Sequence, residues 1–413
     1  MHCRFLTGLC CVAVVSTTTS AGEWTQWRGP NHNNVAESGQ GVPTEWSETM
    51  NVVWKTDVPG RGHSTPIVFG SMVVLTSADE RGQNQAVLAF DRKSGKQLWL
   101  TPISQGGFAK IHDKNTFASP SPATDGVHIY ATFCHHEKIE AVALDLKGRI
   151  VWRKDVGAFR PKLYEYGYAA SPTLYNGTLI INADCDTGAW LKALDTKTGD
   201  IVWEQQRTPM LNWSSPIVAK VGGRDQLLLS GTEKIASYDP ASGTPAWEAR
   251  CLTMATSGTV VFEGDIVFGS GGYPKSETVA VKADGSGQVL WANSVKCYEQ
   301  SMLVHDGYLY AFSDSGIAYC WNAQTGEEQW KRRLEGPESA SPLLVGDLIF
   351  ATNEAGTTWV FKASPEKFEQ IAQNQLGDSS FASAVAVDGQ LFLRVGEGSG
   401  AGRKETLYCI GMK

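Results

Sequence analysis

The chain has 413 residues, of which 42% are apolar and 19% charged, and its formal net charge is −7 at pH 7. A chain of this size can bury a large core, and an acidic balance without a basic stripe argues against a nucleic-acid partner. After residue 21 no apolar run is long enough for a transmembrane helix, so we expect peripheral membrane contact at most.

Residues 1–21 are predicted to be a secretory signal peptide that is cleaved near Ala21. Arg4 supplies the positive start, residues 5–15 form an apolar core too short to span a bilayer, and small polar residues follow. The protein is therefore expected to be periplasmic or secreted. Lipidation stays open, although Leu9 is a poor fit before Cys10, since a lipoprotein signal needs a small residue there.

Residues 22–50 are predicted to be an extended N-terminal segment. They are rich in Asn, Gly and Pro, and we expect Trp24, Trp27 and Trp46 to pin them across one face of the fold. The rest of the chain, residues 51–413, is expected to form one repeat domain.

The repeat is clearest in residues 171–203, which indicate four short strands. Asn176-Gly177 between two apolar runs is a strong hairpin signal. A second turn runs from Asp195 to Gly199, where Asp can bond the backbone and Gly accepts a positive φ. The unit ends with Ile201-Val202-Trp203, so it has the strand content of a propeller blade.

Two signals repeat along the chain. The first is Gly-x-x-x-Trp, found at Gly95/Trp99, Gly148/Trp152, Gly199/Trp203, Gly243/Trp247, Gly287/Trp291 and Gly326/Trp330. The second is a Ser or Thr that opens the first strand of each unit, at Thr65, Ser121, Ser171, Ser215, Ser257, Ser301, Ser341 and Ser383. A period of this size in strand-only units predicts a propeller, and the openers predict eight blades.

The last unit lacks its outer strand because the chain ends soon after Cys409. The missing strand is predicted at the other end, since residues 52–58 match residues 150–156 almost residue for residue. An all-β, eight-bladed propeller of four-stranded antiparallel blades, closed by an N-terminal strand in the last blade, has no free sheet edges.

The Ala-Leu-Asp-x-x-x-Gly-x-x-x-Trp pattern of residues 193–203, with its weaker copies over residues 51–411, resembles the pyrroloquinoline-quinone (PQQ) repeat. The opening Trp24-Thr25-Gln26-Trp27-Arg28-Gly29-Pro30 resembles that of secreted bacterial PQQ-repeat proteins. Two branches share this repeat: quinoprotein alcohol and sugar dehydrogenases, and BamB-like scaffolds of outer-membrane assembly. The repeat indicates the fold, and fold alone does not decide function.

The dehydrogenase branch implies adjacent cysteines beside the quinone, a Trp stacked on it, calcium held by Glu, Asn and Asp, and an Asp base. That constellation does not map onto this chain, whose only adjacent cysteines, Cys10 and Cys11, lie in the signal. We therefore favour an exported, monomeric, non-catalytic scaffold that binds a protein partner, with no cofactor. A small-ligand or glycan binder at the channel mouth is the first alternative, and a PQQ- and calcium-dependent oxidoreductase is the second.

The candidate binding surface is the face with the long connections 100–120 and 153–170, because long polar loops on a rigid scaffold usually carry binding. Residues two and three places before each opener should ring the channel on this face. Met254 and Ser119 fall in that ring, and the partner- or ligand-binding candidates are His63, Lys110, His112, Arg160, Tyr168, Trp213, Tyr298, Glu299, Glu338 and Phe381. A packed channel mouth without a ligand is the alternative.

No metal site is predicted. His135-His136-Glu137 and Asp184-Cys185-Asp186 are interpreted as solvated turns between strands. The spacing of the cysteines indicates no zinc site and names no disulfide pair. Cys320 and Cys409 take positions filled by Ala in other units, so they are expected to be small core residues.

Overall fold

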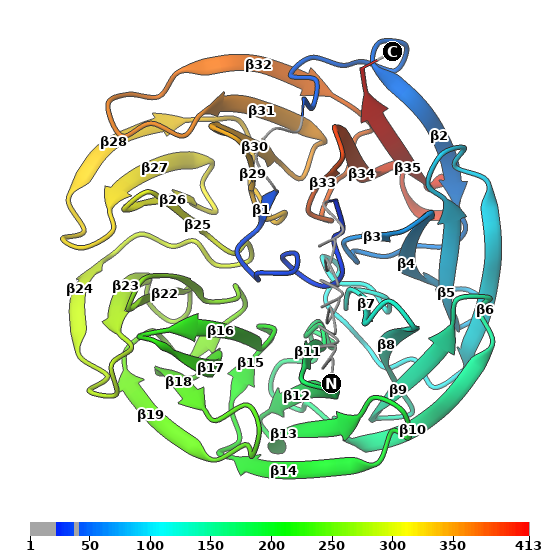
Figure 1. Ribbon diagram of the computed structural model, residues 1–413, viewed down its shortest axis with the longest axis horizontal. Helices are drawn as coiled ribbons and strands as arrows, with labels where there is room; N and C mark the ends of the chain where they lie inside the picture. Colours follow the sequence, from blue (N-terminus) through cyan, green and yellow to red (C-terminus); the bar gives the residue numbers. More distant parts are fainter. Residues whose placement is uncertain (1–21, 37–40, 413) are drawn as a thin grey trace, which may run out of the picture.

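The computed structural model describes residues 22–36 and 41–412, and it is a closed ring of eight β-sheets (Figure 1). Each sheet contributes four antiparallel strands to one blade, so the predicted eight-bladed propeller is confirmed. The predicted signal peptide lies outside the described residues. Within the part of the chain that the structure describes, no helix has the length and apolar character to cross a membrane.

The first four blades follow one another along the chain, each from its inner to its outer strand. Their strands are β3 (Ile67–Phe69), β4 (Met72–Asp79), β5 (Asn84–Asp91) and β6 (Gln97–Gln105); β7 (Ala123–Thr124), β8 (His128–His135), β9 (Lys138–Asp145) and β10 (Ile150–Ala158); β11 (Thr173–Tyr175), β12 (Thr178–Cys185), β13 (Gly188–Asp195) and β14 (Ile201–Arg207); and β16 (Ile217–Val221), β17 (Arg224–Gly231), β18 (Lys234–Tyr238) and β19 (Pro245–Arg250). The short strands β15 (Leu211–Asn212) and β20 (Ala255–Thr256) pair with each other and extend the third sheet.

Blades 5 to 7 repeat this order, and blade 8 draws its outer strand from the start of the chain. Their strands are β21 (Val261–Glu263), β22 (Ile266–Gly271), β23 (Glu277–Lys282) and β24 (Val289–Asn293); β25 (Leu303–His305), β26 (Tyr308–Phe312), β27 (Ile317–Asn322) and β28 (Glu328–Arg333); β29 (Leu343–Val345), β30 (Leu348–Thr352), β31 (Thr357–Lys362) and β32 (Gln370–Gln375); and β33 (Val385–Val387), β34 (Gln390–Glu397), β35 (Lys404–Gly411) and β2 (Val52–Val58), with a single 3-10 turn, η1 (Gly400–Gly402), between β34 and β35.

The closure of the ring agrees with the sequence prediction. Strand β2 pairs antiparallel with β35, and Trp54 lies opposite Cys409. Trp54 packs on Phe392 of the same blade, with ring centroids 6.0 Å apart. The first described strand of the propeller therefore completes the last blade, and no blade is left with an unpaired third strand.

The Gly-x-x-x-Trp motif packs several blades against the next one, whereas Trp247 donates to Gln226 of its own blade at 2.7 Å. The indole Nε1 of Trp152 donates to Thr196 O of blade 3 at 2.9 Å, and that of Trp54 donates to Arg92 O of blade 1 at 2.8 Å. The Gly of the following blade lies on the same indole: a Cβ added at Gly199 would lie 2.8 Å from the Trp152 ring. The glycine is thus required twice, for its φ of +71° and for this close approach.

The N-terminal segment lies in the central channel, where Figure 1 shows it in blue. It bonds in turn to the inner strands of several blades, through Trp24 with Val68, Thr25 with Thr124 and Asn34 with Leu344. Residues Val35–Ala36 of the segment form β1, which pairs parallel with β29. One end of the channel is therefore filled by the chain itself.

Candidate functional site

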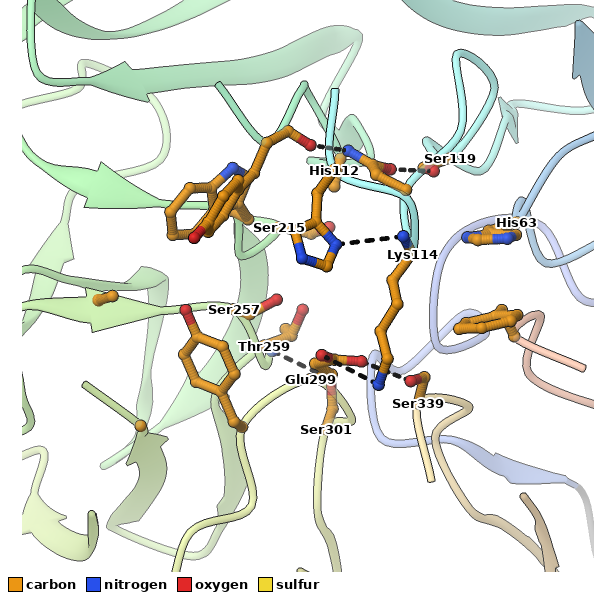
Figure 2. A pocket seen from close by; sticks show the side chains of 18 of the residues that line it. His63, His112, Lys114, Ser119, Ser215, Ser257, Thr259, Glu299, Ser301 and Ser339 are labelled. Atoms are coloured by element: carbon orange, nitrogen blue, oxygen red, sulfur yellow. Dashed lines mark hydrogen bonds and ion pairs between the residues drawn. The ribbon is translucent and has the colours of Figure 1, made fainter. Parts of the chain in front are cut away.

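The other end of the channel opens into a cavity of about 500 Å³ on the loop-rich face. This volume falls in the usual range for small-molecule sites, roughly 300–1,000 Å³. Residues from the loops before the inner strands line it, together with the loops around residues 112–119, 164–169 and 272–273. Figure 2 shows Lys114 reaching across the cavity toward Glu299 and Ser339, with His63 on the right.

A ring of backbone-to-hydroxyl hydrogen bonds forms the floor. The backbone N–H of one opener donates to the hydroxyl oxygen of the opener in the next blade, as in Ser121 to Ser171 at 2.9 Å and Ser341 to Ser383 at 2.9 Å. Such bonds join every pair of neighbouring blades except 4 and 5. The same hydrogen bond repeats from blade to blade. It explains why Ser or Thr recurs at this point of the repeat, because the side-chain hydroxyl accepts the N–H of the preceding blade.

The ring also corrects the predicted opener of blade 5. Strand β21 begins at Val261, and it is the N–H of Thr259, rather than that of Ser257, that donates to Ser301 Oγ at 3.0 Å. The predicted opener at Ser257 was therefore two residues too early, and Met254, counted from it, does not line the cavity. In place of a blade-4 N–H, Thr259 Oγ1 accepts the indole N–H of Trp27 at 3.0 Å.

Trp27 belongs to a rigid part of the N-terminal segment that closes the cavity from below. Beside it, Arg28 is completely buried and donates to the carbonyls of His32 at 3.1 Å and Met302 at 2.9 Å. Burial lowers the pKa of the Arg28 guanidinium to about 9. The segment therefore lies beneath the cavity and is tied to the propeller through Met302 O and Thr259 Oγ1.

Aromatic rings form two opposite walls of the cavity. Tyr166 and Trp213 stack with centroids 5.6 Å apart and an interplanar angle of 28°. His63 and Phe381 stack at 4.4 Å and 9°. Trp213 precedes blade 4 and Phe381 precedes blade 8, which are opposite each other in a ring of eight.

The charged side chains at the cavity are paired among themselves. Lys114 Nζ lies 2.7 Å from Glu354 Oε1 and 3.8 Å from Glu299 Oε1, and Lys296 Nζ lies 3.0 Å from Asp314 Oδ2. Partial burial opposes the charge of Lys114, but its hydrogen bond to Glu354 and the two carboxylates outweigh burial and raise its pKa. Burial, and next the charges of nearby arginines, lower the pKa of His63 well below its usual value.

Six of the ten predicted site residues line the cavity. They are His63, His112, Trp213, Tyr298, Glu299 and Phe381. Lys110 and Arg160 lie on the surface of the long loops, where they are paired with Glu165 at 3.8 Å and Glu137 at 3.1 Å.

The prediction that residues three places before each opener face the channel was wrong for Tyr168 and Glu338. Tyr168 is buried, and its hydroxyl donates to Asn182 O at 3.0 Å. Glu338 is 2% exposed, neither carboxylate oxygen bonds to a described residue, and burial raises its pKa to about 8. Successive side chains of an extended segment point to opposite sides, so in these two blades only the position two places before the opener faces the cavity. Before blade 6, Tyr298 and Glu299 both line it.

The position two places before the opener is the one that faces the cavity in every blade. With Thr259 as the blade-5 opener, this rule names His63, Ser119, Ala169, Trp213, Ser257, Glu299, Ser339 and Phe381, all of which line it. Residues that the sequence prediction missed come from elsewhere in the loops: Lys114, Tyr164, Tyr166, Tyr273 and Lys296. Tyr164 and Tyr166 lie in the 153–170 connection, close in sequence to the predicted Tyr168. That position is the feature of the sequence that could have indicated them.

The two motifs interpreted as solvated turns each contain a buried side chain with a polar partner, so that interpretation was wrong for Asp184 and His135. Asp184 is buried and its Oδ2 lies 2.6 Å from Arg207 Nη1. His135 is buried and its Nε2 lies 3.1 Å from Glu140 Oε2. In residues 22–36 and 41–412, no group of three or more His, Cys, Asp or Glu side chains is arranged to hold a metal.

The cavity can be compared with the calcium-and-quinone constellation that the dehydrogenase branch implies. Its acidic groups are engaged by lysines, and the six cysteines from Cys134 onward are free and non-adjacent. Cys320 and Cys409 are fully buried, as expected of core residues. Burial raises the pKa of the Cys134 and Cys251 thiols to about 12, which keeps both protonated at neutral pH.

Comparison with known proteins identifies the family. The family model described as "Outer membrane protein assembly factor BamB" matches residues 29–102, 83–275 and 275–367, which is most of the chain. The chain belongs to this family. A curated BamB from Yersinia pestis is 23% identical over 365 residues, covering 84% of this chain and 86% of the relative.

Solved structures agree on the BamB-family fold. BamB from Moraxella catarrhalis matches with a TM-score of 0.61 at 13% identity, over 86% of this chain and 96% of that one. Quinohemoprotein alcohol dehydrogenase from Comamonas testosteroni matches with a TM-score of 0.68 at 11% identity, over 95% of this chain and 81% of that one. At such identities the likeness shows the shared propeller and nothing about activity.

Proposed function

We propose that this protein is a non-catalytic scaffold that binds a protein partner in the periplasm or outside the cell, without a PQQ cofactor. Membership in the BamB family supports this, because the family model and the curated relatives are described as outer-membrane protein assembly factors. The signal predicted at residues 1–21 supports export. The paired charges of the cavity and the protonated thiols of Cys134 and Cys251 supply no activated nucleophile.

The observation that carries the proposal is an exposed apolar edge of the cavity on the loop-rich face, made of Tyr164 and Tyr273. Together with the exposed Leu163, which precedes Tyr164 in the chain, these residues are called the rim patch. Leu163 is 72% exposed and Tyr273 48% exposed. Tyr164 lies 6.2 Å from Tyr273 and 5.4 Å from Tyr166, so the aromatic rings continue into the cavity wall. Aromatic residues are enriched in protein interfaces and often dominate their binding energy.

Lys110 and Arg160 belong to the same two long loops and extend this surface with charge. Their ion pairs are exposed, so they are expected to contribute to partner selection and association rate rather than to stability. The rigid blades below hold these loops in place, which lowers the entropy cost of binding.

Site-specific crosslinking tests the proposal. A photoreactive amino acid at position 163 should capture a discrete exported protein, and Leu163→Asp should abolish its co-purification. The matched control is position 202, because Val202 is also exposed, at 53%, but lies on the outer strand β14. Equal capture from both positions, or co-purification that survives Leu163→Asp, would show that the rim patch is not the partner site.

A second measurement tests the absence of quinone catalysis. Addition of PQQ and calcium should produce no dye reduction with alcohols or sugars as electron donors. Turnover that appears with PQQ and disappears without it would replace the scaffold by an oxidoreductase.

A further inference from the structure

The floor of the cavity presents hydroxyl donors that the protein itself does not use. Five ring hydroxyls line the cavity: Ser121, Ser171, Ser215, Thr259 and Ser301. Each oxygen accepts one N–H, from a neighbouring opener or from Trp27. No described residue accepts a hydrogen bond from any of these hydroxyls. A ligand that left these five hydroxyl donors without acceptors would bind poorly. The ligand must therefore carry several oxygen acceptors.

Acceptors are available as well, beside the donors. Glu299 takes a hydrogen bond from Ser339 Oγ at 2.5 Å, and its other oxygen lies 3.8 Å from Lys114, beyond hydrogen-bond distance. The ligand should therefore donate hydrogen bonds as well as accept them, which is the property of an alcohol rather than of a carboxylate or phosphate.

The charges argue for a neutral ligand. Lys114 and Lys296 are each neutralised by carboxylates, and Glu299 adds a negative charge at the cavity surface. An anion would meet Glu299, and a cation would meet the two lysines. A charged ligand of either sign therefore meets a like charge at the cavity, and a charge that is not fully paired in a partly desolvated site is costly.

The two aromatic walls supply the remaining recognition element. The Tyr166–Trp213 stack and the His63–Phe381 stack face each other across the hydroxyl floor. A saccharide ring has apolar C–H faces that pack on aromatic rings and hydroxyls around its edge. A cavity with apolar walls and a few convergent polar groups is the general form of a small-molecule site.

We propose that this cavity binds a neutral saccharide, with ring faces against the aromatic walls and hydroxyls on the Ser/Thr floor and Glu299. This function goes beyond the protein-binding scaffold and does not depend on it. The two functions share Tyr164 and Tyr273, which line the cavity, whereas Leu163 does not line it, so a substitution at position 163 tests the scaffold function separately.

Isothermal titration of the full mature chain with maltotriose, cellotriose and N,N′-diacetylchitobiose tests the proposal, with galacturonate and glucosamine as charged controls. At least one neutral saccharide should bind saturably. The double variant Ser171→Ala/Ser215→Ala should weaken that binding about tenfold, through two lost hydrogen bonds. Trp213→Ala should weaken it as well, and Leu163→Asp should leave it unchanged.

The matched control uses two ring hydroxyls outside the cavity. Ser341 and Ser383 accept the same kind of backbone N–H but do not line it. Ser341→Ala/Ser383→Ala should therefore lose as much thermal stability as the cavity pair and keep full saccharide affinity. Where the cavity pair does not fold, Glu299→Gln replaces it.

Three outcomes overturn the proposal. One is the absence of binding by all neutral saccharides, and another is tighter binding of galacturonate or glucosamine. The third is an equal loss of affinity in the cavity and control pairs. A saccharide that binds a chain whose position 163 captures no protein would support this inference and contradict only the scaffold function.

Discussion

The tryptophans between blades and Trp213 at the cavity have different roles, although each lies at a fixed position of the repeat. Trp152 and Trp203 lie between blades, are 8% and 9% exposed, and donate to a carbonyl of the next blade at 2.9 and 3.3 Å. Trp213 lies at the cavity, is partly exposed and stacks on Tyr166. The tryptophans between blades hold the ring together, and Trp213 leaves a face free for contact with other molecules.

The difference shows how a symmetric fold obtains a site. The blade interfaces need the same contact many times, so Gly and Trp recur at a fixed spacing. The cavity needs different groups around one centre, so the residue two places before each opener varies from His63 to Phe381. Stability should therefore concentrate at the blade interfaces and binding at the cavity.

The largest expected effect is the loss of ring closure. Deletion of residues 51–58 removes β2 and leaves β35 as an exposed edge, which invites aggregation. We expect no cooperative thermal transition and no monomer in gel filtration. Val53→Ser, which changes a 37% exposed side chain of the same strand, should remain folded. A monomeric, cooperatively unfolding deletion would contradict the closure.

The next largest effect is expected where a substitution leaves an empty space between two blades. Trp203→Ala should lower the free energy of unfolding by about 3–5 kcal/mol, because a large buried ring is removed together with its hydrogen bond to Pro240 O. Denaturant unfolding measures the loss. A loss below about 1 kcal/mol would mean that the interface relaxes around the gap.

A buried acid behind the cavity wall should make stability depend on pH. Burial raises the pKa of Glu338 to about 8, so the folded state holds its proton while the unfolded state loses it. The unfavourable contribution of Glu338 to stability is therefore absent below the pKa that this group has in the unfolded chain. Above that pKa the folded protein loses stability as pH rises toward 8, on the order of 1 kcal/mol per pH unit. Glu338→Gln should flatten that fall. Parallel stability–pH curves for the two proteins would argue against a buried neutral acid.

A smaller effect separates the two roles of a motif glycine. Gly199→Ala should cost about 1–3 kcal/mol, because alanine at φ +71° is strained and its Cβ meets the Trp152 ring. The control is Gly177→Ala in the same blade, where φ is +80° and no atom lies within 4 Å. Gly177→Ala should lower the stability less than Gly199→Ala does. Equal losses of stability would mean that backbone strain alone accounts for the effect at Gly199.

The smallest effect on stability is expected at the cavity itself. Trp213→Ala removes a partly exposed ring and one hydrogen bond to Gly167 O, and should cost about 1 kcal/mol. Thermal unfolding beside Trp203→Ala gives the comparison directly. Similar losses of stability in the two variants would contradict the different roles assigned to Trp213 and to the tryptophans between blades.

Much of this architecture could be predicted from the sequence because each blade is encoded locally. Asn176-Gly177 and the Asp195–Gly199 turn specify hairpins within a few residues, and their repetition at a fixed period specifies a ring. The match between residues 52–58 and 150–156 even identified the closing strand, since the same pattern requires the same neighbours.

The cavity depended on contacts that no local pattern contains. Thr259 replaces Ser257 because its N–H meets Ser301 of the next blade, and Lys114 reaches Glu299 and Glu354 from a loop several blades away. Likewise Tyr168 turns inward to Asn182 while Tyr166 turns outward to Trp213. In strands, the hydrogen-bond ladder determines which way a side chain points. In the loops before the strands, the direction depends on contacts with other blades. The fold therefore followed from the sequence, and the composition of the site followed from the tertiary structure.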